Sequence, residues 1–557
     1  MADAPIPPAT IAGRAPSSIP RRSPWGEVGR WAPLALAAVI LVWHAQRYDF
    51  VTDDAFISFV FSRNFAEHGA LVFNPGDPVE GYTNFLWTFG LGVLMLLGIP
   101  PELAARVLGV GFGLGVLAMS FRIAERVLGR RHPGAGLAPL LLACSSGFAC
   151  WSSGGLETQL YTFLIAVALD GYLAACAGEE LRGLRRMAMG LALASMTRPE
   201  GPMIAALFAV HRVAWNLIGE RRWKPNRAEW SAALTFLGLW APWFAWRWWF
   251  YGWPFPNTYY VKAAGAAVPG YDAKMRANGW YYVGRWFAQT RLWWGLPLAI
   301  GGLIARPRRD ARFALVTLAP VIFLVYLRYV AGVGGDFMGL HRFIMPLFVL
   351  AALAVALGAA NLGALIKAPA GRWLGVAVGA VVLALFARTQ LALTRASLRP
   401  GNYANDRGID TPAFLRTYTH DRILIGKALR ACVRDDDFAI FGGVGALPYY
   451  AHLRGIDVFG LVSSRVAHEV PRTNPRAGHN KWGPDPLMLE HHPTIVLSCY
   501  DLRRGPGAAP LSHCAGFWLA NGFEKVVLRV PGLQERGEYL TFLARRDRAL
   551  ACPGLER

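Results

Sequence analysis

The sequence predicts a polytopic α-helical membrane protein that ends in a soluble α/β domain. Of its 557 residues, 54% are hydrophobic and only 17% are charged, whereas soluble proteins usually carry about 25% charged residues. Several apolar runs approach the roughly 20 residues with which a helix crosses a bilayer. Lys and Arg gather in short clusters between these runs, as they do in the loops of membrane proteins.

The first 30 residues are rich in proline and end in basic residues. This pattern does not fit a removable signal peptide. We therefore expect a disordered cytoplasmic tail over residues 1–30, followed by a retained first helix.

The apolar runs predict a membrane domain over residues 31–395 with about eleven spans. We place them near 31–45, 104–122, 137–152, 158–177, 187–197, 201–218, 230–250, 291–305, 311–330, 342–362 and 373–395. The apolar stretch 84–98 is too short for a crossing and runs into two prolines. We expect it to lie along the membrane surface as an interfacial helix.

The basic clusters fix the orientation of this arrangement. With the N-terminus inside, the inner segments carry 21 Lys and Arg residues and the outer segments carry 8, which is the positive-inside pattern. Counting 84–98 as a span would reverse every later loop. The net charge of +21 therefore indicates topology and not nucleic-acid binding. The pattern predicts a multi-pass protein of the bacterial inner (plasma) membrane, with periplasmic loop 1 at 45–103 and residues 396–557 outside.

Residues 396–557 contain four β-like runs, "DFAIFGG", "TIVLSCY", "EKVVLRV" and "YLTFLARR", and a helix-like "GALPYYAHL". This mixture predicts a periplasmic α/β domain. Cys432, Cys499, Cys514 and Cys552 lie here and allow two disulfides with three connectivities in an oxidising compartment, or free thiols. The stretch "GGVGALP" resembles a dinucleotide loop, but Pro448 stands where a third glycine belongs, so we discount that interpretation.

Polar motifs gather on the predicted outer face. Each outer segment holds ionisable or aromatic residues: "VTDDAFISF" and "NPGDPVEGYTNFLW" in loop 1, then "SSGGLETQ", "TRPEG", the aromatic-rich 251–290, and "GGDFMGLHRF". Ionisable residues near membrane depth are costly and usually functional. Structural roles compete with this interpretation: Glu157 and Glu200 as helix caps, Arg198 as a snorkelling side chain, and the aromatic residues as an interface belt.

Asp53 and Asp54 are the hardest of these residues to explain structurally, because adjacent acids repel each other beside apolar surface. Sugar transfer from a polyprenyl phosphate accounts for them. It needs a carboxylate base for a hydroxyl nucleophile, cationic groups for a leaving phosphate and a groove open to lipid. The two acids could also hold a divalent cation (Mg, Mn or Ca) that neutralises the phosphate, and this alternative stays open. No other cofactor is expected.

The motifs, taken in order, resemble those of the GT-C membrane glycosyltransferases. They are "DDAFISF…RN…G…NPG…VEGYTNFLW", "GLE", "TRPEG" and "GGDFM…HRF". Within GT-C they are most similar to the mycobacterial terminal arabinofuranosyltransferase group, also labelled AftB or ZomB-like. The tail segment "GALPYY…GIDVFGLVSSRVAH" is similar to the outer domain of that group, so the likeness runs over roughly 50–500.

The resemblance implies a GT-C fold and transfer of a sugar, plausibly D-arabinofuranose, from a polyprenyl-phospho-sugar to a cell-envelope glycan, lipid or protein. The family's catalytic aspartate maps to Asp53, with Asp54 beside it. From residue chemistry we assign Arg198, His341 and Arg342 to the donor phosphate. We assign the following residues to sugar or acceptor hydroxyls: Glu80, Tyr82, Asn84, Glu157, Glu200 and Asp336.

Other functions stay open at this point. The same carrier could deliver another sugar, such as mannose or aminoarabinose. A glycan transporter would need charges buried along a pathway and an internal repeat, and neither is visible in the sequence. A non-enzymatic envelope or motility factor gives no reason for two acids at the bilayer edge.

Overall fold

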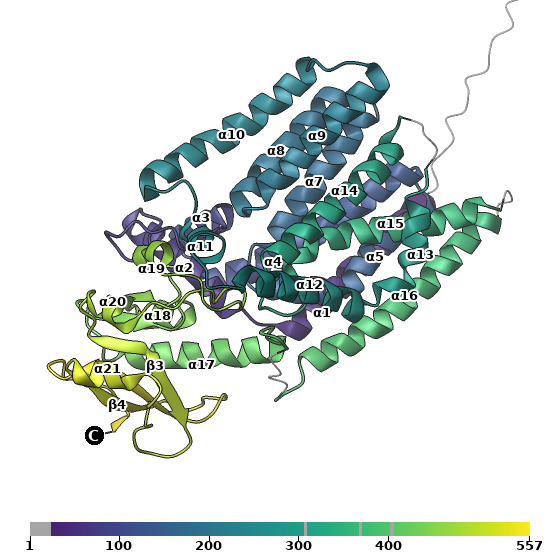
Figure 1. Cartoon of the computed structure of the whole chain (residues 1–557). Helices are drawn as coiled ribbons and strands as arrows, with labels where there is room; N and C mark the ends of the chain where they lie inside the picture. Colours follow the sequence, from purple (N-terminus) through teal and green to yellow (C-terminus); the bar gives the residue numbers. More distant parts are fainter. Residues whose placement is uncertain (1–23, 306–308, 367–369, 402–405, 557) are drawn as a thin grey trace, which may run out of the picture.

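The computed structural model describes residues 24–305, 309–366, 370–401 and 406–556; most of the predicted tail 1–30 lies outside them. Figure 1 shows a large bundle of helices with a smaller sheet-containing part packed against one end of it. We call residues 406–556 the C-terminal region.

The bundle is built from helices α1–α16. Their bounds are α1 Pro24–Tyr48, α2 Asp53–His68, α3 Phe85–Leu96, α4 Pro101–Leu128, α5 Leu137–Cys144, α6 Ser146–Ser153, α7 Thr158–Cys176, α8 Glu180–Thr197, α9 Gly201–Glu220, α10 Arg227–Tyr251, α11 Asn257–Lys262, α12 Tyr271–Thr290, α13 Leu296–Gly302, α14 Ala311–Gly332, α15 Met345–Ala364 and α16 Ala370–Ser397. Short 3₁₀ turns lie at η1 Pro133–Gly136, η2 Leu292–Trp294 and η3 Arg342–Ile344.

Fewer helices qualify as spans than the sequence predicts. Within the described residues, six helices are long and apolar enough to cross a membrane, and eight if each of two bent pairs is one span. The predicted span at 291–305 is wrong, because α13 covers only seven residues. The predicted spans at 187–197 and 230–250 are helical, in α8 and α10, but neither helix is among those long and apolar enough to cross a membrane. In α8 the reason is that charged residues fill the first turns. The short helix α3 spans 12 residues, about 18 Å, and cannot cross.

Helices α1 and α2 form one of the bent pairs, and the bend places the two acids. The chain turns by 95° between Tyr48 and Asp53. Thr52 is extended at the N-cap of α2 (φ −73°, ψ 153°), and its N–H donates to the Gly154 carbonyl at 3.1 Å. Asp53 and Asp54 therefore begin α2, where carboxylates are favourable beside the free N–H groups of the first turn.

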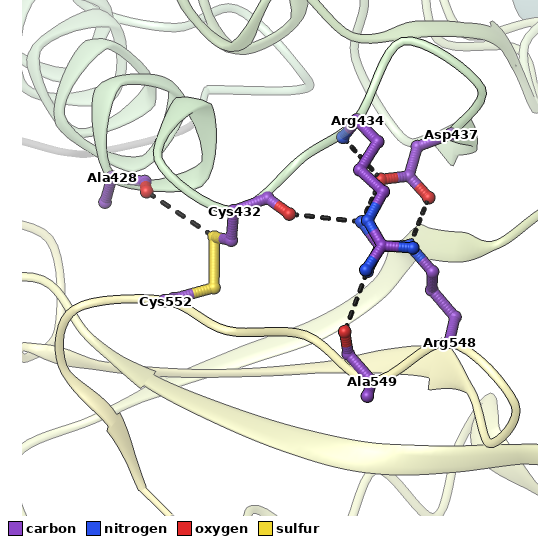
Figure 2. The surroundings of a disulfide bond; sticks show 7 residues. All are labelled: Ala428, Cys432, Arg434, Asp437, Arg548, Ala549 and Cys552. Carbon is purple, nitrogen blue, oxygen red and sulfur yellow. Dashed lines mark hydrogen bonds and ion pairs between the residues drawn. A yellow bond between two sulfur atoms is a disulfide. The ribbon is translucent and has the colours of Figure 1, made fainter.

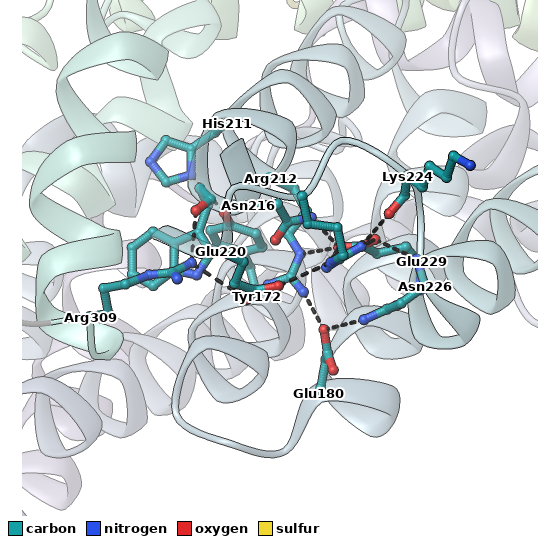
Figure 3. A network of polar contacts seen from close by, with 12 residues as sticks. Tyr172, Glu180, His211, Arg212, Asn216, Glu220, Lys224, Asn226, Glu229 and Arg309 are labelled. Carbon is teal, nitrogen blue, oxygen red and sulfur yellow. Dashed lines mark hydrogen bonds and ion pairs between the residues drawn. The ribbon is translucent and has the colours of Figure 1, made fainter. Parts of the chain in front are cut away.

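The other end of the helices carries a separate charged network (Figure 3). Arg212 of α9 pairs with Glu180 and with Glu229, the latter at 2.7 Å. Asn226 and Glu229 form a reciprocal capping box at the start of α10. This network supplies hydrogen-bond and ion-pair partners to charged residues near the helix ends, in the basic loops that the sequence predicts to lie inside. Arg198 lies at the opposite end of α8 and α9.

The C-terminal region contains a six-stranded mixed sheet in the order β2-β1-β3-β5-β4-β6. Strand β1 pairs in parallel with β2 and β3, and the remaining pairs are antiparallel. The four predicted β-like runs are confirmed as β1, β3, β4 and β5, and "GALPYYAHL" as α18; β2 and β6 were not predicted. The bounds are α17 Pro412–Arg430, β1 Phe438–Phe441, α18 Ala446–Ala451, β2 Arg454–Asp457, α19 Ser464–Glu469, α20 Asp485–Leu489, β3 Ile495–Arg503, α21 Ala515–Ala520, β4 Phe523–Arg529, β5 Tyr539–Arg545 and β6 Leu555–Glu556.

Two disulfides join this region, Cys432–Cys552 and Cys499–Cys514. Figure 2 shows the first of them beside a buried ion pair, in which Arg548 contacts Asp437 at 2.6 Å. The disulfide ties the end of α17 to the last residues of the chain, so the first and last parts of the region are fixed to each other.

The C-terminal region docks on loop 1 and α2 through buried polar contacts. Asn74 exchanges two hydrogen bonds with the main chain of Gly455, both at 3.0 Å. The Arg63 guanidinium donates to the Tyr449 carbonyl at 2.7 Å. A Cβ at Gly81 would come within 2.8 Å of Val462. These contacts hold β2, α18 and the loop before α19 against the helical bundle.

Candidate active site

The two acids at the start of α2 face different surroundings. Both side chains are only partly buried. Because consecutive residues on a helix point about 100° apart, Asp53 and Asp54 reach different neighbours. Asp53 faces the C-terminal region, and Asp54 faces the charged ends of the bundle helices.

The C-terminal region holds Asp53 directly. The Ala446 N–H donates to Asp53 Oδ1 at 2.8 Å, and Arg422 of α17 lies within electrostatic range of the same carboxylate. Gly445 packs so closely that a Cβ there would overlap the Asp53 carboxylate. The segment "GGVGALP" is therefore a glycine loop that contacts the Asp53 carboxylate of its own chain.

Asp54 lies within electrostatic range of Arg342, Lys262 and Asp336. Lys262 ends α11 and is accessible to solvent, yet the surrounding protein lowers the pKa of its ammonium by excluding water, and Asp54 opposes this shift. Within the described part of the chain, the ammonium makes no ion pair inside 4 Å.

Glu157, Arg198 and Glu200 form a buried cluster where α7, α8 and α9 meet. Arg198 contacts Glu157 at 2.6 Å and Glu200 at 2.8 Å. Both glutamates stand at helix N-caps, but neither side chain makes a capping hydrogen bond. The acids therefore bind the arginine instead of capping helices, and Arg198 is buried instead of reaching toward headgroups.

A second buried pair, Asp336–Arg342, lies beside this cluster at 2.9 Å. The two glycines before Asp336 have left-handed φ values of 86° and 73°, and a Cβ at Gly335 would come within 2.6 Å of Tyr282. The Phe343 ring lies 5.1 Å from the Arg342 guanidinium and 4.7 Å from that of Arg198. This shared ring joins the two pairs into one assembly through cation–π contacts.

His341 points to a different set of neighbours. Its Nε2 lies 2.8 Å from the Gln289 side chain, and the amide orientation that satisfies both neighbours has Gln289 donating to it and accepting from Arg285. Burial and the nearby Arg285 lower the pKa of His341 to about 3. The imidazole is therefore neutral and brings no positive charge for a phosphate.

The three loop-1 residues assigned to sugar binding separate into two places. Asn84 donates to Glu157 Oε2 at 3.0 Å, so it supports the Arg198 cluster. Glu80 forms a buried ion pair with Arg247 of α10, and Tyr82 hydrogen-bonds Tyr251 at 2.9 Å. Glu80 and Tyr82 thus brace loop 1 against α10.

The residues do not make a protein metal site on their own. Across residues 24–305, 309–366, 370–401 and 406–556, no group of three or more His, Cys, Asp or Glu side chains is placed to hold a metal ion. Asp53 and Asp54 would supply at most two ligands, and Asp53 already accepts the Ala446 N–H.

Three contributors to this site escaped the sequence analysis. Lys262 looked like one basic residue in an aromatic outer segment, and only the fold brings α11 opposite Asp54. Gly445 and Ala446 belong to a loop first compared with nucleotide binding. Their one signal in the sequence is the dense glycine pattern. Such a pattern indicates that another group approaches the backbone closely, but it does not identify that group.

The sequence is similar to two terminal β-(1→2)-arabinofuranosyltransferases. It is 26% identical over 353 residues to the Corynebacterium glutamicum protein, covering 56% of this chain and 49% of that one. It is 26% identical over 364 residues to the Mycobacterium tuberculosis protein, covering 58% and 55%. The match thus spans about half the length of these relatives. No family model matches the chain.

The fold extends the comparison over nearly the whole chain. ArnT from Cupriavidus metallidurans bound to undecaprenyl phosphate superposes with a TM-score of 0.58 at 13% identity, covering 94% of this chain and 98% of ArnT. The chain has the GT-C fold of ArnT. The apo form of that ArnT superposes with a TM-score of 0.53 at 14% identity, over 94% and 99%. The expected GT-C architecture is confirmed, and the chain is a multi-pass membrane protein.

Proposed function

We propose that the chain is a glycosyltransferase that moves D-arabinofuranose from a polyprenyl-phosphate-linked donor to a hydroxyl of a cell-envelope acceptor. The observation that carries the proposal is that the Asp54 carboxylate lies within electrostatic range of the Lys262 ammonium, which is unpaired within the described residues, close to the buried ion pairs of Arg198 and Arg342. The likeness to terminal β-(1→2)-arabinofuranosyltransferases supports the sugar and a β-(1→2) linkage. The ArnT fold, seen with undecaprenyl phosphate in that protein, supports the donor class.

In this proposal Asp54 is the general base. It removes the proton from the acceptor hydroxyl while the oxygen forms a bond to C1 of the donor sugar. The bond between C1 and the phosphate oxygen breaks, and its electron pair leaves with the polyprenyl phosphate. The sequence assigned this role to Asp53; the Ala446 N–H bound to Asp53 Oδ1 favours Asp54, whose neighbours are the site's cations.

Lys262 is the cation best suited to the departing phosphate. Arg198 is shared by Glu157 and Glu200, and Arg342 is paired with Asp336, so each guanidinium already has its counter-charge. Lys262 has no such partner within the described residues and is accessible to a ligand. Its three N–H donors would stabilise the charge that develops on the phosphate oxygens.

The buried ion pairs would orient the sugar. Carboxylates held by arginine keep fixed positions, and fixed acceptors at a water-poor site bind sugar hydroxyls with defined geometry. Glu157, Glu200 and Asp336 retain this assignment, with Arg198 and Arg342 holding them in place, and Lys262 takes the phosphate role that the sequence assigned to these arginines. His341, being neutral, would contribute at most a hydrogen bond.

Asp54 and Lys262 face the outer side of the membrane in this proposal. Two disulfides in the C-terminal region fit an oxidising compartment, and the basic clusters fit the cytoplasmic side. Nucleotide sugars are not available outside the cytoplasm, which favours a lipid-linked donor. The C-terminal region would then be periplasmic, as the sequence predicts.

A second candidate keeps the reaction and changes the sugar. The likeness to ArnT covers nearly the whole chain, whereas the likeness to the arabinofuranosyltransferases covers about half of it. Transfer of another lipid-linked sugar, such as mannose or aminoarabinose, is therefore the alternative.

A donor panel tests the proposal. The full chain in lipid nanodiscs would receive synthetic polyprenyl phosphates bearing arabinofuranose, mannose or aminoarabinose, with and without an octyl-linked arabinofuranosyl disaccharide. We expect acceptor-dependent release of polyprenyl phosphate from the arabinofuranose donor alone. Release only from another donor would keep the class and replace the sugar. No release from any donor would overturn the proposed function.

A further inference from the structure

A recess lies between loop 1 and the segment that follows α10, apart from Asp54. It has a volume of about 160 Å³ and is lined by loop 1, by the segment after α10 and by the start of α19. Figure 1 shows α11 and α19 beside each other between the bundle and the sheet. The side chains that line it include Asp77, Trp253, Phe255, Asn257 and Ser464.

The walls of this recess are held by buried polar contacts. Arg247 binds Glu80 beneath it and donates to the Pro254 carbonyl at 2.7 Å. The Asn257 N–H donates to the Glu80 carbonyl at 2.9 Å, and its side-chain amide donates to the Gly460 carbonyl at 2.7 Å. The recess is therefore formed before any ligand arrives, as binding sites usually are.

The recess offers an aromatic platform and polar groups at its edge. The Trp253 indole stacks on His468 at 3.9 Å and contacts the Tyr260 ring edge to face at 5.5 Å, yet 45% of the side chain is still exposed. Phe255 is 47% exposed beside it. Asp77 and Ser464 reach the rim from loop 1 and α19. A ring face flanked by a carboxylate and a hydroxyl matches the apolar face and the hydroxyl edge of a sugar.

Helix α11 leads from this recess toward Asp54. Asn257 at its first residue lines the recess, and Lys262 at its last residue lies within electrostatic range of Asp54. Five residues of α-helix span about 7.5 Å, which is a distance that one or two sugar units can bridge. A glycan bound at Trp253 could thus extend its end toward the base.

We propose that the recess formed by Asp77, Trp253, Phe255 and Ser464 is a subsite for the penultimate sugars of the acceptor glycan. Trp253 stacks on a sugar ring and Asp77 accepts hydrogen bonds from its hydroxyls. This inference rests on the proposed function, since it names where the acceptor of that reaction binds. We propose a glycan as the ligand of this recess. The alternative is that these aromatic rings contact lipid as part of an interface belt.

Kinetics of matched variants test the subsite. Trp253→Ala should raise the KM for the octyl-linked arabinofuranosyl disaccharide by about fivefold to tenfold, as expected for loss of one ring contact. Trp253→Phe should recover most of that loss, because it keeps a ring face. Asp77→Asn should raise the same KM by about tenfold. In each variant the donor KM should change less than the acceptor KM.

The control is Trp249→Ala. Trp249 is exposed on α10 and does not line the recess, so a lipid belt would make it behave like Trp253. We expect its two KM values to match the wild type. Equal effects of Trp249→Ala and Trp253→Ala, or an unchanged acceptor KM in Trp253→Ala, would overturn the subsite.

A binding measurement separates this proposal from the reaction itself. Saturation-transfer NMR on Asp54→Asn in nanodiscs, with the disaccharide as probe, should show transfer to its non-terminal ring, and Trp253→Ala in that background should abolish it. Binding without turnover in the wild type would count against the proposed function and leave the subsite standing. No transfer in Asp54→Asn would contradict the subsite.

Discussion

At the scale of single residues, the cations near Asp54 are of two kinds. The two arginines are already paired with carboxylates, and the lysine is not. Arg198 lies between two carboxylates, and Arg342 is paired with Asp336. Lys262 is accessible and unpaired within the described residues. An anionic ligand beside Asp54 would therefore gain most from Lys262, because the arginines would have to share charge with their own acids.

Replacing Lys262 tests this distinction. Lys262→Gln should raise the donor KM by about tenfold or more, the cost of losing one hydrogen bond to a charged group, and Lys262→Arg should recover part of it. The measurement is polyprenyl phosphate release against donor concentration. Lys274→Gln is the control, since Lys274 is exposed in the same outer segment. A wild-type donor KM in Lys262→Gln would assign the phosphate to the arginines instead.

At the scale of elements, the loop between β1 and α18 links the C-terminal region to the chemistry. Its Gly445 leaves room for the Asp53 carboxylate, and Ala446 donates to it. In our proposal Asp53 is thus a positioning residue that fixes the start of α2 and, through it, Asp54.

Adding one methyl group to this loop tests the link. Gly445→Ala should overlap the Asp53 carboxylate, shift the start of α2 and lower kcat by about a hundredfold, as expected for a misplacement near 1 Å. Gly442→Ala is the control, because a Cβ there meets Ser498 only at 3.6 Å. Thermal unfolding of both variants should stay near the wild type. An unchanged kcat in Gly445→Ala would remove the loop from the site.

Sequence reasoning reached the elements with strong local signals. The β-like runs of the C-terminal region and the short apolar α3 carry their pattern in consecutive residues, and the paired acids stand out beside apolar surface. It failed where a long-range contact decides. The span predicted at 291–305 is broken into η2 and α13, and the roles of Lys262 and Gly445 depend on residues more than 150 positions away.

At the scale of the whole molecule, two disulfides stabilise the C-terminal region on which the site depends. Cys432–Cys552 closes a separation of 120 residues and Cys499–Cys514 one of 15. Closing a longer loop removes more entropy from the unfolded chain, about 4–5 kcal/mol against about 3 kcal/mol. The longer disulfide should therefore matter more for stability.

Paired serine variants test this order. Replacing Cys432 and Cys552 together should lower the thermal unfolding midpoint more than replacing Cys499 and Cys514, with tryptophan fluorescence in nanodiscs as the measurement. Cys176→Ala, at a free cysteine in α7, is the control for loss of a thiol. Midpoints equal to that of Cys176→Ala would mean that neither bond forms in the membrane-embedded protein.

The central claim is that the Asp54 carboxylate takes the proton of the acceptor hydroxyl. The most direct measurement compares sugar transfer by Asp54→Asn, Asp53→Asn and the control Asp49→Asn, whose side chain is exposed. We expect Asp54→Asn to lose about a thousandfold in kcat, Asp53→Asn to lose about tenfold because asparagine still accepts the Ala446 N–H, and Asp49→Asn to match the wild type. Full loss in Asp53→Asn with substantial turnover in Asp54→Asn would contradict the account and return the base to Asp53.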